Sequence, residues 1–288
     1  MDIIKFSWMK YKRLYLVAVI VLLLISIGGC STDDSSLQVN AKENWTEVGN
    51  SIYIFTSDFY LANITLVVSN GEGILIDTGA NKEDQEKIQQ FLKENNIKLS
   101  NIIITHKHMD HYANINALKT EDMIPVTPEN AKQGQQIQLG DKTLRIIFTE
   151  GHFAPKGHIS VELLEDNVLI AGDVICNGIV PPVSAGGNLF DLMNTLEELQ
   201  KHKYSLIIPG HGDIVPTKKI FQINLGYLEN AKQHVEQLMA KGGKITDLKG
   251  IKLEDCLKDT SDYYKENLEG WHLKNLHKIY LDIKTKTP

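Results

Sequence analysis

Three histidines and one aspartate lie within six residues of one another in the sequence THKHMDH, as His106, His108, Asp110 and His111. They follow a β-branched run at residues 102–104, which is typical of a buried strand. In a loop at the end of a strand, alternate side chains can turn toward one point while their neighbours turn toward another. Imidazole and carboxylate groups are suitable ligands for divalent transition metals, so this spacing predicts a metal site rather than a solvated histidine-rich turn.

Three further candidate ligands follow later predicted strands, and each comes directly after a glycine: His152, Asp173 and His211. A glycine at such a position lets the backbone turn sharply and approach a crowded site. Each pair of a glycine and a following candidate ligand is weak evidence by itself, because a single Gly-Asp is more often a simple turn. Four separate strand ends that all deliver histidine or aspartate form a strong joint signal for one metal centre.

The motifs of the chain together resemble those of the metallo-β-lactamase superfamily. The resemblance rests on THKHMDH, Gly151-His152, AGDV, PGHGD and the upstream LIDTG, and it covers the chain from about residue 45 to the C-terminus. It implies an α/β fold of the αββα four-layer sandwich type, with metals at the sheet edges. By position, it assigns one zinc to His106, His108 and His152, and a second zinc to Asp110, His111 and His211. It also implies that Asp173 bridges the zincs and that Asp77 is a buried orienting residue.

The third motif departs from the family pattern. Many members have two histidines four residues apart there, whereas His152 and His158 are six apart, with the extra residues inside 153–157. His152 is the expected ligand because it alone follows the strand end directly, and His158 then supports the site or contacts the substrate. The exchanged assignment is the alternative. Relatives with a di-iron site usually carry Glu where this chain has His108, so the resemblance favours zinc.

Hydrophobic periodicity predicts two similar halves around these motifs. The first half has expected strands at residues 51–56, 64–68, 73–76 and 102–104, with a helix capped by Asn81. The second half has expected strands at residues 136–139, 144–149, 159–163, 168–171 and 205–208. Its helices are expected at about 189–202, from 217 to the Gly242-Gly243 pair, and at about 261–283. Strands followed by helices, twice over, suggest two sheets packed face to face with helices outside.

The first 29 residues differ in composition from the rest of the chain. Basic residues precede an apolar run at residues 14–27, and Gly28, Gly29 and Cys30 follow it. The run has 14 residues, short of the roughly 20 that span a bilayer, and fits the apolar region of a signal peptide. The small residues before Cys30 resemble a bacterial lipoprotein signal, with an uncleaved anchor as the alternative. We expect a lipoprotein signal peptide at 1–29, a lipid-anchored flexible tether at 30–44 and a hydrolase domain at 45–288, on the extracytoplasmic face of the cell membrane.

Charge and cysteine content limit the partners of the domain. Without residues 1–29 the chain has 26 basic and 35 acidic groups, a formal charge of −9. Such a domain repels phosphate backbones, so no nucleic-acid partner is expected. Three cysteines are too few for a disulfide scaffold, and sequence alone leaves open whether Cys176 and Cys256 pair.

The resemblance implies a zinc-dependent hydrolase with two Zn²⁺ per chain and a small-molecule substrate. A metal-bound hydroxide is expected to attack an ester, lactone, lactam or thioester bond, with β-lactam-type hydrolysis as a leading example. Asp110 is the expected catalytic group, because it can accept or relay the proton. Phe59-Tyr60 and Trp271-His272 are weaker candidates for lining the pocket. The alternative from another class is a non-catalytic zinc- or ligand-binding surface lipoprotein.

Overall fold

The computed structural model describes residues 39–42, 45–49, 51–183, 186–257 and 267–286. All of these residues belong to one compact unit, Leu37–Pro288. The expected signal peptide at 1–29, Cys30 and the first part of the expected tether lie outside the described residues. Among the described helices, none combines the length and the apolar character that a membrane crossing requires.

The first sheet has six strands that follow one another in chain order, from β1 to β6. Neighbours are antiparallel from β1 to β5, whereas β6 is parallel to β5 because helix α1 (Lys82–Glu94) returns the chain to the same end of the sheet. Asn81 caps α1 as predicted, since its side chain accepts a hydrogen bond from the Asp84 N–H at 3.0 Å. The strands are β1 (Val39–Lys42), β2 (Trp45–Val48), β3 (Ile52–Thr56), β4 (Asn63–Ser69), β5 (Glu72–Ile76) and β6 (Lys98–Ile103).

The second sheet has five strands in the order β11-β10-β9-β8-β7. The strands from β7 to β10 form an antiparallel meander, and helix α4 (Leu189–Lys201) then returns the chain so that β11 runs parallel to β10. The strands are β7 (Gln136–Leu139), β8 (Lys142–Phe148), β9 (Ile159–Leu163), β10 (Val168–Cys176) and β11 (Leu206–His211).

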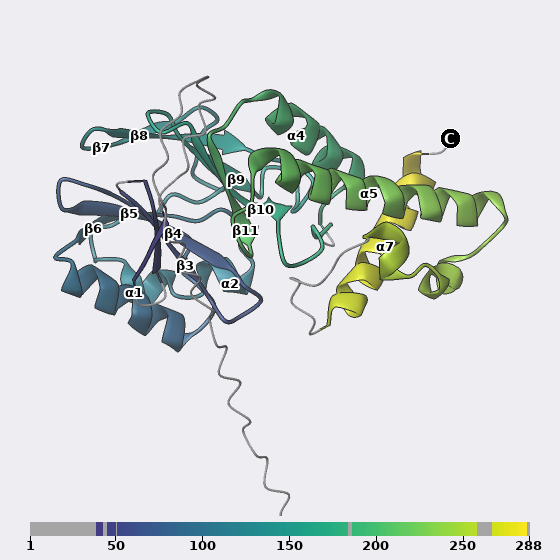
Figure 1. The fold of residues 1–288 in the computed structure, drawn as a ribbon, viewed down its shortest axis with the longest axis horizontal. Coiled ribbons are helices and arrows are strands. Elements are labelled where there is room, and N and C mark those ends of the chain that lie inside the picture. The colour runs from purple at the N-terminus through teal and green to yellow at the C-terminus, as the bar shows by residue number, and fades with distance from the viewer. Residues whose placement is uncertain (1–38, 43–44, 50, 184–185, 258–266, 287–288) are drawn as a thin grey trace, which may run out of the picture. The chain divides into compact units, whose positions relative to one another are not determined.

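The inner faces of the two sheets share one apolar core. Ile54 and Val67 from the first sheet, with Ile146 and Val161 from the second, are almost completely buried in it. Helix α1 and the short α3 (Ile115–Leu118) pack on the outer face of the first sheet, and α4 and α5 (Thr217–Ala240) pack on that of the second (Figure 1). The fold is therefore an αββα sandwich, and the predicted fold class is confirmed.

Helix α7 (Leu268–Lys286) closes the described chain and packs against α5. Between these two helices lie the 3₁₀ turn η1 (Ile245–Gly250) and the short helix α6 (Leu253–Cys256). Helix α5 ends at Ala240, just before Gly242-Gly243, as its apolar period predicts. Most of the predicted span of the last helix, about 261–283, falls in α7, but residues 258–266 lie outside the described part.

The expected boundary between the tether and the domain is wrong. Val39–Lys42, predicted to belong to the flexible tether at 30–44, form β1 and pair with β2. An edge strand is held by backbone hydrogen bonds to its neighbour, so it can form without apolar alternation in its sequence. The β2 strand was also missed, although it buries Trp45 and Val48. The folded domain therefore begins before residue 45.

Strands β10 and β11 run further than their apolar patterns predict. They contain Asp173 and His211, which the sequence places just beyond the strand ends. The register between the two strands shifts between Ile170 and Gly172 and again between Gly172 and Cys176. Such bulges redirect a side chain without ending a strand, so the polar residues lie inside the sheet rather than after it.

Candidate metal centre

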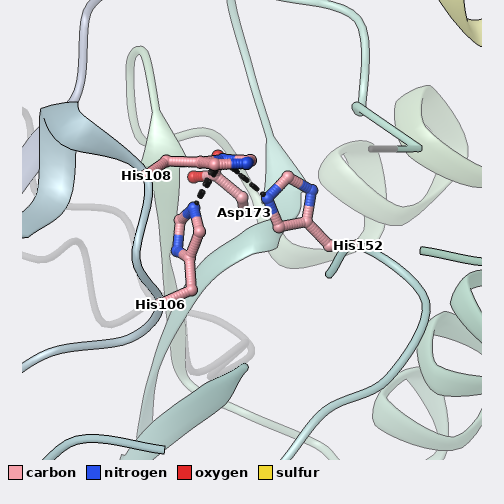
Figure 2. A group of neighbouring side chains, drawn as sticks. All are labelled: His106, His108, His152 and Asp173. Carbon is pink, nitrogen blue, oxygen red and sulfur yellow. Dashed lines mark hydrogen bonds and ion pairs between the residues drawn. The ribbon is translucent and has the colours of Figure 1, made fainter. Parts of the chain in front are cut away.

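The seven predicted metal ligands come together as two adjoining groups of side chains. The first group is drawn in Figure 2 and consists of His106, His108, His152 and Asp173. The second group consists of Asp110, His111 and His211. Within each group, the candidate ligand atoms all lie within 4.8 Å of one another. The loops after β6 and β8 and the bulged strands β10 and β11 thus deliver their polar residues to one place.

The spacing of the first group suits one zinc ion. His108 Nδ1 lies 3.0 Å from His106 Nε2 and 3.3 Å from His152 Nε2, and Asp173 Oδ2 lies 3.5 Å from each of those two Nε2 atoms. In a tetrahedral zinc site with bonds of about 2.0–2.1 Å, neighbouring ligand atoms are about 3.3 Å apart. These four of the six separations are close to those of a tetrahedral ligand set, and all six lie within 4.8 Å.

The second group surrounds the other oxygen of the same carboxylate. Asp173 Oδ1 lies 3.2 Å from both His111 Nε2 and His211 Nε2, and these two nitrogens are 3.4 Å apart. Asp110 Oδ2 lies 3.8 Å from His111 Nε2 and 3.6 Å from His211 Nε2. Although it is buried, Asp173 Oδ1 has no hydrogen-bond partner among the described residues. His211 Nε2 also lies 3.2 Å from Asp173 Oδ2, so the carboxylate lies between the two groups, where the resemblance places a bridging residue.

Outer hydrogen bonds hold three of the histidines with Nε2 directed inward. His152 Nδ1 donates to the Pro182 carbonyl, His211 Nδ1 to the Tyr60 carbonyl and His111 Nδ1 to Asp77 Oδ2, each at 2.8 Å. A neutral imidazole carries only one N–H, so the Nε2 atom of each ring then presents a lone pair. His111 Nε2 and His211 Nε2 are 3.4 Å apart, so either a proton or a metal cation must lie between them. This arrangement fits a divalent metal.

Electrostatics keep most of these side chains in the form that binds metal. Burial lowers the pKa of all three histidines in the first group and brings that of His152 to about 4. Burial would raise the pKa of Asp173, but His211, His111 and His106 outweigh it and hold that pKa well below the usual value. The first group therefore consists of neutral imidazoles and an ionised carboxylate, which metal binding requires.

The second group holds protons more firmly. Burial would lower the pKa of His111, but the Asp173 and Asp77 carboxylates outweigh it and raise that pKa well above its usual value. The pKa of His211 is also raised, because Asp173 outweighs the effect of burial. Without a metal, a proton must therefore compensate the carboxylates of this group, and a bound cation would replace it.

Asp77 is the buried orienting residue that the resemblance implies. It accepts hydrogen bonds from the Thr105 backbone N–H and hydroxyl, both at 2.8 Å, as well as from His111. The Thr105 hydroxyl also lies 3.0 Å from His106 Nδ1. Through these bonds, one carboxylate orients a histidine in each group.

His158 lies beside the cluster but directs neither ring nitrogen into it. Its Nε2 accepts a hydrogen bond from the Asp173 N–H at 3.1 Å, and its Nδ1 lies 2.7 Å from the Thr149 hydroxyl. The ring stacks on that of His106, with centroids 5.0 Å apart. His152 occupies the position facing the cluster, and His158 supports the backbone of Asp173.

A cavity of about 540 Å³ lies over the cluster and includes His108, Asp110, Asp173 and His211 in its lining. Its size is that of a small-molecule site. Among the aromatic candidates, Tyr60 and Trp271 line it, with ring centroids 4.7 Å apart. His272 is buried against Tyr227 instead, and Phe59 is exposed. A second cavity of about 590 Å³ lies beside α4, but none of the seven candidate ligands lines it.

The sequence did not reveal which backbone groups orient the histidines. The Tyr60 and Pro182 carbonyls do so, and a carbonyl oxygen carries no signal in the residue type. Tyr60 and Leu61 have positive φ angles of 55° and 61°, an uncommon conformation for bulky residues. The Leu61 carbonyl accepts from the Gly212 N–H at 2.8 Å, so this unusual turn is tied to the segment that carries His211.

A family model described as the metallo-beta-lactamase superfamily matches residues 57–135 and 128–211, together more than half of the chain. The chain belongs to this superfamily. Two solved structures share its fold. A metallo-β-lactamase family protein from Thermus thermophilus has a TM-score of 0.59 at 17% identity, covering 82% of this chain and 94% of its own. A metallo-β-lactamase from Pontibacter korlensis has a TM-score of 0.53 at 18% identity, covering 67% and 99%.

The curated relatives align with this chain over only about half of their own length, in contrast to the two solved structures. Thioesterase pkgB from Emericella nidulans is 26% identical, over 67% of this chain and 56% of its own. Beta-lactamase-like protein 2 homolog from Caenorhabditis elegans is 27% identical, over 53% and 56%. Atrochrysone carboxyl ACP thioesterase AgnL7 from Paecilomyces divaricatus is 27% identical, over 54% and 51%. The chain spans about half the length of these curated relatives.

Proposed function

We propose that the protein is a metal-dependent hydrolase that holds two zinc ions between the two groups of side chains. The observation that carries this proposal is the position of Asp173, whose carboxylate lies between the two groups and contacts histidines of both. Superfamily membership and the open cavity beside the cluster support it further. A purely structural zinc site is normally closed by four protein ligands and needs no such cavity.

Asp110 is the proposed proton acceptor of the reaction. When bound, two divalent cations at such a site activate a water at neutral pH and polarise a carbonyl oxygen. The Asp110 side chain is 14% exposed against 3% for Asp173, and it lines the cavity. It can therefore take a proton from the attacking water and release it to the leaving group or to solvent.

The cavity favours a small acyl substrate with an apolar body and a negative charge. Ile179, Val180, Val183 and Leu281 contribute apolar walls. Lys274, His277 and Lys278 of α7 add basic groups, whereas the acidic groups of the lining are Asp110 and Asp173, both proposed metal ligands. Lys278 pairs with Asp282, and no described residue forms an ion pair with Lys274. Thioesters are the first class to test, because two of the curated relatives are named thioesterases.

We also propose that the protein is anchored to the outer face of the cell membrane through Cys30. The support is the sequence alone: basic residues, the apolar run at residues 14–27 and Gly28-Gly29 directly before Cys30. A location outside the cytoplasm would bring the cavity to substrates from the surroundings of the cell.

A substrate panel separates the hydrolase from a non-catalytic zinc-binding protein. The purified domain would be assayed with thioesters, esters, lactones and β-lactams, once with zinc and once after a chelator. We expect about two zincs per chain and hydrolysis of at least one class that stops on chelation and returns with zinc. Two bound zincs without chelator-sensitive hydrolysis of any class would favour the binding protein instead.

A further inference from the structure

Asn275 of helix α7 is buried and takes no direct part in the metal cluster, yet all its hydrogen-bonding groups are used. Its Oδ1 accepts from the Val183 N–H at 3.0 Å. Its Nδ2 donates to the Pro181 carbonyl at 3.0 Å and to the Tyr227 hydroxyl at 3.2 Å. An asparagine amide has two N–H donors, and both are used here, so this side chain has no donor left to offer a substrate.

The segment that Asn275 holds is the one that orients His152. Pro181 and Pro182 have no N–H, so this stretch cannot anchor itself through its own amide donors until Val183. Asn275 binds the carbonyl before Pro182 and the N–H after it. The Pro182 carbonyl between them accepts the bond from His152 Nδ1 at 2.8 Å. Asn275 therefore holds both sides of the group that sets the tautomer and direction of His152.

The other end of this network reaches the C-terminal part of the fold. Because the Tyr227 hydroxyl accepts from Asn275, its own proton is directed to His272 Nδ1 at 2.9 Å. His272 Nε2 then donates to the Ile251 carbonyl at 3.2 Å. Donors and acceptors alternate consistently along this chain, which gives Asn275 a rigid support in α5 and in the segment before α6.

We propose that Asn275 is a positioning residue for the metal centre, which fixes His152 as a ligand by clamping residues 181–183. This inference rests on the proposed function, because it concerns the same metal site. Outer partners that hold a ligating histidine through its second nitrogen typically change metal affinity by about 10–100-fold when they are removed. The effect should fall on the site that contains His152 and spare the site of Asp110, His111 and His211.

Zinc titration against a competing chelator tests the inference without any substrate. Asn275→Leu removes all three hydrogen bonds at similar volume, and His152→Ala identifies which of the two sites is affected. We expect Asn275→Leu to weaken that site about 10–100-fold and to leave the other unchanged. The cobalt-substituted variant should show an altered absorption spectrum at the same site. If the leucine variant does not fold, Asn275→Asp removes the two donated bonds and keeps the acceptor for Val183.

Tyr227→Phe removes the support of Asn275 but leaves the bonds from Asn275 to residues 181 and 183, so it should weaken the same site less than Asn275→Leu does. Its thermal stability without metal would be compared with that of the Asn275 variant. Equal weakening of both zinc sites, no weakening, or a larger loss in Tyr227→Phe than in Asn275→Leu would overturn the positioning role. A wild-type protein that binds no zinc would instead refute the proposed function.

Discussion

Asp110 and Asp173 carry the same carboxylate in different surroundings, and this difference assigns them different roles. Asp173 contacts imidazoles of both groups, and His211 lies 3.2 Å from each of its oxygens, so it is the proposed bridging ligand. Asp110 reaches the cavity and forms longer contacts with His111 and His211, at 3.8 and 3.6 Å. A carboxylate that meets both the cluster and the cavity is suited to move a proton between them.

Asp110→Asn should therefore remove nearly all turnover. The amide keeps the size of the side chain but cannot accept a proton, so kcat should fall at least about 100-fold with little change in KM. Steady-state kinetics on the best substrate of the panel, with zinc content measured in parallel, would check this. The zinc measurement distinguishes loss of the proton acceptor from loss of metal. A variant with two zincs and near-normal kcat would reject the assigned role.

Lys274 is the residue expected to recognise a negative charge on an apolar ligand. The dye 8-anilinonaphthalene-1-sulfonate and its uncharged relative N-phenyl-1-naphthylamine share a ring system and differ by the sulfonate. Lys274→Met should weaken binding of the sulfonate dye about fivefold and leave the uncharged dye unchanged, because an exposed charge pair contributes about 1 kcal/mol. Fluorescence titration gives both affinities. Lys284→Met on the same helix is the control, since Lys284 does not line the cavity.

An unchanged affinity of the Lys274 variant for the sulfonate dye would show that this cation does not select the ligand. The outcome would leave the metal site and hydrolysis untouched, because neither depends on Lys274.

At the scale of strands and helices, the glycines before the ligands have the close contacts that the sequence predicts. A Cβ atom on Gly210 would lie 2.2 Å from Asp173 Oδ1 and 2.6 Å from the Gly172 carbonyl carbon. A Cβ on Gly151, whose φ is +99°, would lie 2.0 Å from the Leu192 N. These glycines let strand β11 and the start of α4 approach the cluster closely enough to complete it.

Gly210→Ala should consequently damage both stability and metal binding. The added methyl group meets the bridging carboxylate and backbone, so we expect a loss of about 2 kcal/mol in the free energy of unfolding and fewer than two zincs per chain. Gly226→Ala is the control, because a Cβ there would have nothing within 4 Å and helix α5 favours alanine. Denaturant unfolding and zinc analysis measure both effects. Equal stability and zinc content in the two variants would contradict the close-contact argument.

Side-chain types made the candidate ligands predictable, whereas the groups that orient them could not be predicted from the sequence. His106, His108 and His111 stand in a spacing that few structures other than a metal site require. By contrast, the Pro182 carbonyl and Asn275 reach His152 only through tertiary packing, and no local pattern marks them. Edge strand β1 was missed for a related reason, since backbone pairing alone holds it. Hydrophobic periodicity was enough to predict the sandwich fold, because the alternation of apolar residues indicates which face of a strand is buried.

His272 should make the metal-free domain less stable in mild acid. Burial lowers its pKa, although the Ile251 carbonyl and the acidic Glu269, Asp255 and Glu254 oppose this effect. Below about pH 6.5 the unfolded chain binds a proton that the folded chain refuses, so stability is full above that pH and declines as pH falls toward the folded pKa. One such group changes the free energy of unfolding by at most about 1.4 kcal/mol per pH unit.

Replacing His272 by Gln should remove the part of the pH dependence of stability that comes from this one proton. Denaturant unfolding between about pH 5 and pH 7.5, on metal-free wild type and His272→Gln, measures the difference in slope. The variant should be less stable at the upper end of this range because it loses the hydrogen bond between His272 and Tyr227. Its stability should nevertheless change less with pH. Parallel pH profiles would show that His272 is not the group responsible.

At the scale of the whole molecule, the three cysteines differ in their chemistry. Cys176 and Cys256 are free and buried, and they pack in the apolar core with α5 and α7. Burial raises the pKa of the Cys256 thiol to about 12, and burial followed by the nearby Asp173 raises that of Cys176 further above its usual value. The thiolate is the reactive form of cysteine, so both are protected from modification. Cys30 lies outside the described residues and is the proposed site of lipid attachment.

Cys30→Ser should abolish lipid labelling and release the protein from the membrane fraction. Cells expressing the full chain would be given a labelled fatty acid, and labelling and detergent partitioning would be compared for wild type, Cys30→Ser and Cys256→Ser. The Cys256 variant should keep full labelling, because its thiol is buried. Hydrolysis should be the same in wild type and Cys30→Ser, since the metal centre lies wholly within the domain. Labelling that survives Cys30→Ser, or that disappears in Cys256→Ser, would show that the anchor has been assigned to the wrong residue.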